Sequence, residues 1–159
     1  MRITIAAVGK IKESYLEAAI AEYSKRLSRY CKLEILQAAD EKTPDGASEA
    51  LERQIRQREG ERLLSLIRDD AYVIALAIEG KPLDSVELSE RLGRLAAGGR
   101  SHLVFVIGGS LGLSEAVMHR ADEAWSFSRL TFPHQLMRVI LLEQIYRGYR
   151  ILNHQPYHK

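Results

Sequence analysis

The sequence predicts an α/β protein with a mainly parallel β-sheet and helices on both faces. Strand-like and helix-like segments alternate along the whole chain, which is the pattern of repeated βαβ units. Residues 71–78 and 102–107 are apolar almost throughout, as strands covered on both faces of a parallel sheet are. The 159 residues show no linker, repeat or low-complexity stretch, so we expect a single domain spanning residues 1–159.

The first two strands are each followed by a turn or loop and then a helix. Residues 2–8 contain β-branched residues and stop at Gly9, which predicts a strand and a turn. Ser14 and Glu17 have the spacing of a capping box, so the first helix is expected to begin there. Its apolar face consists of Leu16, Ile20, Tyr23 and Leu27. Residues 33–36 predict a short second strand, which leads into a polar loop.

Two more helices flank the apolar third strand. Residues 48–68 have an apolar stripe at helical spacing, and their highly charged middle is expected to face solvent. After the strand, Glu79-Gly80-Lys81-Pro82 predicts a turn. A helix capped by Asp84 or Ser85 follows, and it is expected to end at Gly98-Gly99.

Two segments are placed to bind a ligand. Gly108-Gly109-Ser110-Leu111-Gly112 directly follows the strand at 102–107, before a helix capped by Ser114, and ligands of open α/β sheets bind beyond the carboxyl ends of the strands. These glycines either let the backbone come close to a ligand or simply allow a strand-to-helix turn. Their spacing matches neither the GxGxxG dinucleotide motif nor the phosphate-binding loop that ends in Gly-Lys-Ser/Thr. Residues 127–134 follow a short strand expected at 124–127 and offer backbone groups to an adenine edge, with Leu130 and Phe132 covering the ring.

Pro133 opens a long helix that reaches about Arg150 and is apolar on most sides. Its apolar residues are Leu136, Met137, Val139, Ile140, Leu141, Leu142, Ile145, Tyr146 and Tyr149. A helix of this kind must be covered on nearly every side. We therefore expect it both to enter the core and to pack against a second subunit in a homodimer.

Composition excludes several classes of protein. The longest apolar run is eight residues, whereas a membrane span needs about 20, and the N-terminus lacks a secretory signal, so we expect a cytoplasmic protein without a membrane partner. Cys31 is the single cysteine and no metal-ligand cluster appears, which argues against a metal. The net charge is only +2, but residues 126–159 carry five basic residues and one acidic residue, which fits either a phosphate-bearing partner or an ordinary solvated C-terminal helix.

Several stretches match one known family. They are Ala7-Val8-Gly9-Lys10, Phe105 to Ser114, Phe127 to His134, the positions Arg138 and Tyr146-Arg147, and the C-terminal Pro156-Tyr157-His158-Lys159. Over essentially its full length the chain resembles the ribosomal RNA large-subunit methyltransferase H family of the SPOUT superfamily. The resemblance implies an α/β fold with a C-terminal trefoil knot, and a homodimer with S-adenosylmethionine sites at the subunit interface. It also implies methylation of N3 of a pseudouridine in helix 69 of 23S rRNA, on assembled ribosomes.

The resemblance also implies the site residues. Contacts to S-adenosylmethionine fall on Leu76, Gly108, Phe127, Ser128, Arg129, Leu130, Thr131 and Phe132. Contacts to the RNA, and the chemistry, fall on His134, Arg147, Tyr157 and His158. Either histidine can accept the N3 proton, while Arg147 or His158 can stabilise the uracil anion. Ser110 and Leu111 depart from the family pattern.

Two other classes of function compete with this interpretation. One is a small-molecule enzyme that binds a nucleotide at the glycine turn, which the absence of a GxGxxG motif argues against. The other is a non-catalytic RNA-binding or ribosome-assembly protein that retains a nucleotide-binding α/β fold. Arg147 also has a purely structural alternative, because Glu143 lies four residues before it and can form a helical ion pair with it.

Overall fold

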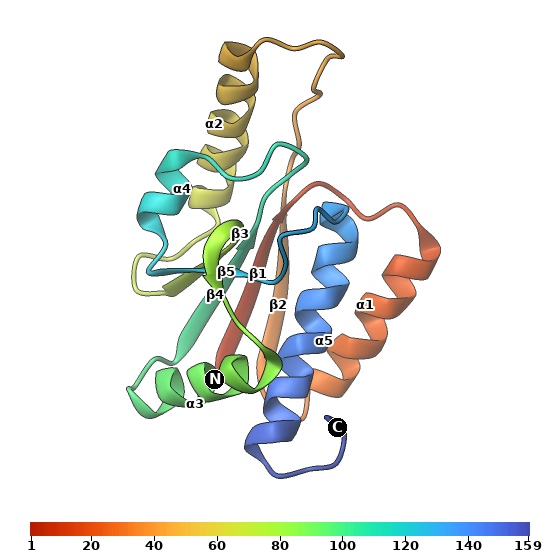
Figure 1. Ribbon diagram of the computed structural model, residues 1–159, viewed down its shortest axis with the longest axis vertical. Helices are drawn as coiled ribbons and strands as arrows, with labels where there is room; N and C mark the ends of the chain where they lie inside the picture. Colours follow the sequence, from red (N-terminus) through yellow and green to blue (C-terminus); the bar gives the residue numbers. More distant parts are fainter.

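Five parallel strands form one sheet in the order β2-β1-β4-β3-β5 in the computed structural model, which describes residues 1–159 (Figure 1). The strands are β1 (Arg2–Val8), β2 (Lys32–Ala38), β3 (Tyr72–Pro82), β4 (His102–Ile107) and β5 (Glu123–Ser126). Each pair of neighbours is parallel. The predicted α/β class with a parallel sheet is therefore confirmed.

Helices cover both faces of this sheet. The helices are α1 (Ser14–Leu27), α2 (Glu49–Ser65), α3 (Ser85–Ala97), α4 (Glu115–Arg120) and α5 (His134–Leu152). The larger apolar cluster joins the sheet to α1, α3 and α5, and the smaller one joins it to α2 and α4. Alternate residues of β1 supply the two clusters, with Ile3 and Ile5 in the first and Ala6 and Val8 in the second, because successive side chains of a strand point to opposite faces.

The predicted caps at Asp84 and Ser114 are confirmed, Ser48 is a further cap, and the cap predicted at Ser14 differs. Ser48, Asp84 and Ser114 accept hydrogen bonds from the amides of Leu51, Glu87 and Val117 at the starts of α2, α3 and α4. The predicted capping box at Ser14 is wrong. Ser14 is already the first helical residue of α1, and Glu13 occupies the cap position without a side-chain bond.

The third strand is longer than predicted. Residues 79–82 were expected to form a turn, but Lys81 and Pro82 pair with Trp125 and Ser126, so β3 continues to Pro82. Leu76 and Lys81 both pair with Trp125, so the register shifts between them. At this shift the backbone of Gly80 packs directly on β5. A Cβ atom there would lie 2.7 Å from the carbonyl carbon of Ala124 and 2.8 Å from that of Trp125. This close passage of a late strand beside β3 is consistent with the knotted topology that the family resemblance implies.

Replacing Gly80 by alanine should destabilise the fold, because β5 backbone must move to admit the methyl group. We expect Gly80→Ala to lower the free energy of unfolding by about 1–3 kcal/mol, the usual cost of overpacking. Gly93→Ala is the matched control, because the added Cβ would lie 3.0 Å from the mobile tip of Leu152 and not from backbone. Alanine also favours a helix over glycine by about 1 kcal/mol, so this control should lose little or nothing. Urea unfolding of both variants checks the prediction, and an equal loss in the two would contradict it.

Candidate functional site

A cavity of about 860 Å³ lies at the carboxyl ends of β4 and β5 and beside the second half of β3. Ile107 and Trp125, at or next to the ends of β4 and β5, line its wall together with Leu76 in the middle of β3. The rest of the wall comes mainly from the glycine loop at 108–112 and from the segment at 127–134. The two segments that the sequence marks for ligand binding therefore share one cavity, at the edge of the sheet where α/β proteins bind ligands.

The glycine loop needs its glycines for two different physical reasons. A Cβ atom on Gly108 would lie 2.7 Å from the carbonyl group of Gly112, so only glycine fits there. Gly112 has a φ of +85°, which side-chain-bearing residues avoid, and its amide donates to the Gly109 carbonyl at 3.1 Å. The loop is thus both a strand-to-helix turn and a cavity wall made largely of backbone. Ser110 and Leu111 also line the cavity.

The segment before α5 supplies the facing wall. Phe127, Ser128, Leu130, Thr131 and Phe132 line the cavity, as do Leu76 and Gly108, whereas Arg129 does not. The hydroxyl of Ser128 accepts a hydrogen bond from the Leu130 amide at 2.9 Å, which holds the segment in a tight turn. Leu130 is 70% exposed at the rim of the cavity.

Several lining residues were not predicted from the sequence. Arg56 projects from α2, in the charged stretch expected to face solvent, and Ile78 and Glu79 follow the buried part of β3. Met137 completes the wall from the first turn of α5. No sequence signal identifies Arg56 as a cavity residue. It is one of many charged residues on α2, and only the packing of the elements determines which of them faces the cavity.

His134 is the predicted catalytic residue that lines the cavity. It is the first residue of α5, and its Nδ1 atom is buried without a hydrogen-bond partner. Burial and the nearby Arg138 guanidinium lower the pKa of His134 below its ordinary value. The imidazole is therefore neutral at pH 7 and retains a nitrogen that can accept a proton.

Arg138 serves the fold and not a phosphate group. It is 1% exposed, and its Nη2 donates to the carbonyl oxygen of Gly9 at 3.1 Å, at the end of β1. Its Nε and Nη1 atoms have no partner, and burial lowers the pKa of the guanidinium. One of the five basic residues that the sequence assigned to a phosphate-facing C-terminus is thus inside the protein.

The other three predicted catalytic residues form a cluster at the far end of α5. Arg147 Nη2 lies 2.6 Å from Glu143 Oε1, so the anticipated helical ion pair is present. Arg147 Nη1 also lies 3.2 Å from His158 Nδ1, and its guanidinium stacks 4.7 Å from the centre of the Tyr157 ring. Burial and the Glu143 carboxylate raise the pKa of Tyr157 to about 12, so this phenol stays protonated at neutral pH.

This cluster and the cavity are well separated within one chain. His134 and Arg147 lie thirteen positions apart on the same helix, α5. At 1.5 Å per residue, their backbones are about 20 Å apart along the axis. A single chain in this arrangement therefore does not bring the four predicted residues to one reacting atom.

Comparison with known proteins identifies the family. A family model described as a predicted SPOUT methyltransferase matches residues 1–158. The chain belongs to the SPOUT methyltransferase family. The predicted family is thus confirmed, and as a member the chain is a methyltransferase, an enzyme that needs a methyl donor.

Relatives with this fold are similar over the whole chain. Proteins named ribosomal RNA large subunit methyltransferase H from Bifidobacterium adolescentis, Clostridium tetani and Clostridium kluyveri are 63%, 58% and 55% identical, each over 100% of both chains. A solved structure of a probable methylase family protein from Haemophilus influenzae aligns with 99% of this chain and 70% of its own, with a TM-score of 0.57 and 11% identity. That likeness shows a shared fold.

The structure contains neither a helix suited to span a membrane nor a group of metal ligands. None of its helices combines the length and apolarity of a membrane span. Likewise, no three His, Cys, Asp or Glu side chains are grouped so that they can hold a metal ion.

The lowered pKa of His134 predicts how this methyltransferase loses stability in acid. An unfolded histidine takes up a proton near pH 6.5, whereas the folded His134 resists protonation to a lower pH. Protonation therefore favours the unfolded chain, and stability should fall as the pH drops below about 6.5. Urea unfolding at pH 7, 6 and 5 should show a shallower loss for His134→Gln than for wild type. His154→Gln is the control at an exposed histidine, and a slope identical in wild type and His134→Gln would contradict the burial argument.

Proposed function

We propose that this chain is a ribosomal RNA methyltransferase that uses S-adenosylmethionine to methylate N3 of a pseudouridine in helix 69 of 23S rRNA, on assembled ribosomes in the cytoplasm. The observation that supports it most directly is the single cavity shared by the glycine loop and residues 127–134. The relatives named for ribosomal RNA methylation, at 55–63% identity over full length, support the substrate class.

The cavity suits S-adenosylmethionine in size and chemistry. Its volume of about 860 Å³ falls within the usual range of about 300–1,000 Å³ for ligand pockets. Leu76, Phe132 and Met137 offer apolar surface for an adenine ring, and the backbone of residues 108–112 and 127–132 offers hydrogen-bonding groups for its edge. When bound, S-adenosylmethionine supplies an electrophilic methyl group on a positively charged sulfur. The carboxylate of Glu79, also in the wall, favours a cationic ligand.

The residues of the chain would act by positioning and proton transfer. Methyl transfer is an in-line displacement, so a fixed approach of donor and acceptor supplies much of the rate. The acceptor imide nitrogen must lose its proton, and either neutral His134 in the cavity wall or His158 of the tail can accept it. The guanidinium of Arg147 can stabilise the negative charge left on the base. Since Tyr157 stays protonated, it can stack on a base or donate a hydrogen bond but does not act as the general base.

A homodimer would bring the two halves of the site together. The separation of about 20 Å along α5 is bridged if the Arg147, Tyr157 and His158 of one protomer border the cavity of its partner. Apolar side chains exposed near the cavity provide a surface for a second copy. Leu130 is 70% exposed, Ile78 is 52% exposed and Leu136 is 37% exposed. Because a two-fold dimer is self-complementary, it forms two such composite sites at once.

Mixed dimers test whether the site is shared between subunits. Gly108→Val should block the cavity, and the double substitution Tyr157→Ala/His158→Ala should disable the tail, so each homodimer should be inactive. A heterodimer of the two, co-expressed with different tags, keeps one site with both halves intact and should recover about half of wild-type methylation. Methylation of ribosomes with labelled donor is the measurement. Purified heterodimers without activity would show that each site lies within one chain.

Ligand-dependent thermal shift tests the cofactor and separates the function classes. S-adenosylmethionine and S-adenosylhomocysteine should raise the melting temperature, because a ligand that binds only the folded state stabilises it, whereas NAD and ATP should not. The Tyr157→Ala/His158→Ala variant should keep this shift while losing methyl transfer. Transfer to ribosomes but not to naked rRNA would support the assembled substrate. Ribosome binding without methyl transfer by wild type would instead favour the non-catalytic alternative.

A further inference from the structure

The end of α1 and the turn into β2 form a strongly basic surface outside the cavity. We call residues 24–33 the basic turn. It contains Lys25, Arg26, Arg29 and Lys32 and no acidic residue. Lys25, Arg29 and Lys32 are exposed and form no ion pair or side-chain hydrogen bond, while Arg26 pairs with Glu22 at 3.1 Å. The net charge of the chain is only +2, so these three free cations are a local concentration of positive charge.

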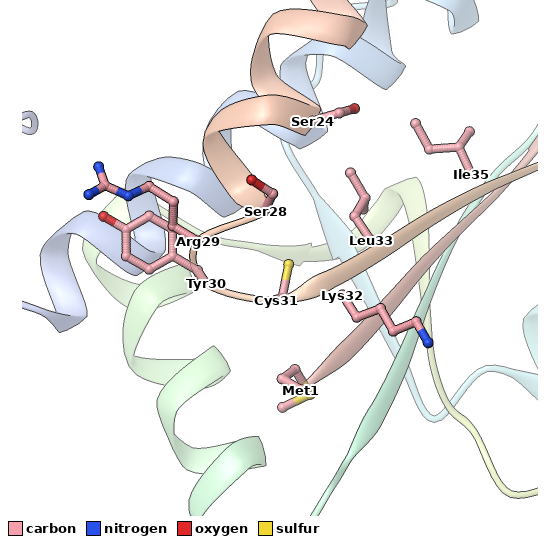
Figure 2. A pocket seen from close by; sticks show the side chains of 9 residues that line it. All are labelled: Met1, Ser24, Ser28, Arg29, Tyr30, Cys31, Lys32, Leu33 and Ile35. Carbon is pink, nitrogen blue, oxygen red and sulfur yellow. The ribbon is translucent and has the colours of Figure 1, made fainter.

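A shallow hollow of about 870 Å³ runs along the basic turn. Figure 2 shows Arg29 and Tyr30 together at one end of it and Lys32 at the other, with the hydroxyls of Ser24 and Ser28 along the side of α1. Cys31 lies in the floor, but burial raises the pKa of its thiol to about 11, so it is not a reactive thiolate at neutral pH. The hollow therefore offers the cations Arg29 and Lys32 and the hydroxyl of Ser24 to a ligand, since the Ser28 hydroxyl already donates to the Lys25 carbonyl at 2.6 Å.

The basic turn is continuous with the tail cluster at Arg147 and Tyr157. Tyr30 stacks on Tyr149 of α5 with ring centres 5.4 Å apart, and its hydroxyl accepts a hydrogen bond from Arg150 at 3.2 Å. Arg150 in turn donates to the Pro156 carbonyl at 2.8 Å, which holds the C-terminal tail against this end of α1. Figure 1 shows the C-terminus beside the same ends of α1 and α5.

Aromatic rings fill the space between these cations. Tyr146 meets Tyr157 edge-on with centres 4.9 Å apart, and meets Tyr30 at 6.2 Å. The guanidinium of Arg26 lies 5.6 Å from the centre of the Tyr146 ring, and that of Arg150 lies 5.9 Å from it. From His158 to Tyr30, tyrosines and basic side chains thus contact one another, and the hollow of the basic turn begins at Tyr30.

We propose that the basic turn binds the phosphate backbone of the RNA substrate on the side of the tail cluster away from the target base. This rests on the proposed function, because it assigns a docking surface for the same substrate. An open hollow with separated cations suits a chain of phosphates that passes through it, whereas a single small anion is held best by converging donors. The basic turn also supplies positive charge that the C-terminal segment does not offer to RNA. In that segment Arg138 is buried and Arg147 is paired with Glu143.

Neutralising the three free cations should weaken RNA association without disturbing the cavity. We expect Lys25→Gln/Arg29→Gln/Lys32→Gln to bind purified bacterial ribosomes about tenfold or more weakly at 0.1 M salt. Affinity falls as salt rises, and each lost phosphate contact makes the plot of log affinity against log salt less steep by about 0.7. Losing three contacts should therefore make it less steep by about two. The thermal shift with S-adenosylmethionine and kcat at saturating ribosomes should be unchanged, while KM for ribosomes rises.

A matched control separates a local contact from a general effect of net charge. Lys42→Gln/Arg53→Gln/Arg58→Gln removes the same charge from exposed positions in and before α2, and it should bind ribosomes nearly as wild type does. Equal losses in the two triple variants, or unchanged binding and salt slope in the first, would overturn the proposal. A loss that does not vary with salt would also overturn it, because a protein contact and not phosphate would then be involved.

The same experiment keeps this proposal distinct from the proposed function. Ribosome association is measured in the presence of S-adenosylhomocysteine, so it needs no catalysis, and the difference between wild type and the basic-turn variant reports on the basic turn. If wild type bound ribosomes in this salt-dependent way but transferred no methyl group to them, the docking surface would stand and the proposed reaction would fail. If methyl transfer occurred with full affinity in the basic-turn variant, the reaction would stand and the docking surface would fail.

Discussion

The cavity depends on two places where backbone packs against backbone with no room for a side chain. Gly80 lies against Ala124 and Trp125, and Gly108 lies against the Gly112 carbonyl. The first contact fixes β5 beside β3, and the second closes the glycine loop over the end of β4. A methyl group at either point would move one wall away from the other, and interiors packed at crystal-like density do not absorb such a shift easily. The shape of the cavity therefore depends on glycine at positions 80 and 108, where no side chain fits.

Helix α5 links every part of the candidate site. Its first residue, His134, lines the cavity, its buried Arg138 binds the end of β1, and Arg147 near its other end organises the C-terminal tail. A straight helix holds these groups at fixed separations. In the proposed homodimer, a partner subunit would cover apolar surface of α5 and would also bridge the distance between His134 and the tail.

Local sequence patterns predicted most of the fold but only part of the site. The continuous apolar runs and helix caps sufficed for the parallel sheet and for the starts of α2, α3 and α4, because these features depend on neighbouring residues. The extension of β3 to Pro82 and the burial of Arg138 could not be predicted, since both depend on segments more than 40 residues away. The segments at 108–112 and 127–134 were predicted from their positions after strands, and the family resemblance supplied the individual contacts. Arg56, Glu79 and the basic turn became recognisable only once distant elements were in place.

The position of β5 also has a consequence for how the protein matures during translation. Strand β5 and helix α5 are synthesised after the other four strands and four helices, yet β3 is paired on one of its edges only by β5, and the cavity takes walls from both late elements. Long-range pairings of this kind form slowly and only after the intervening chain is available. A nascent chain therefore has no finished cavity until β5 and α5 have been synthesised and have packed on the sheet.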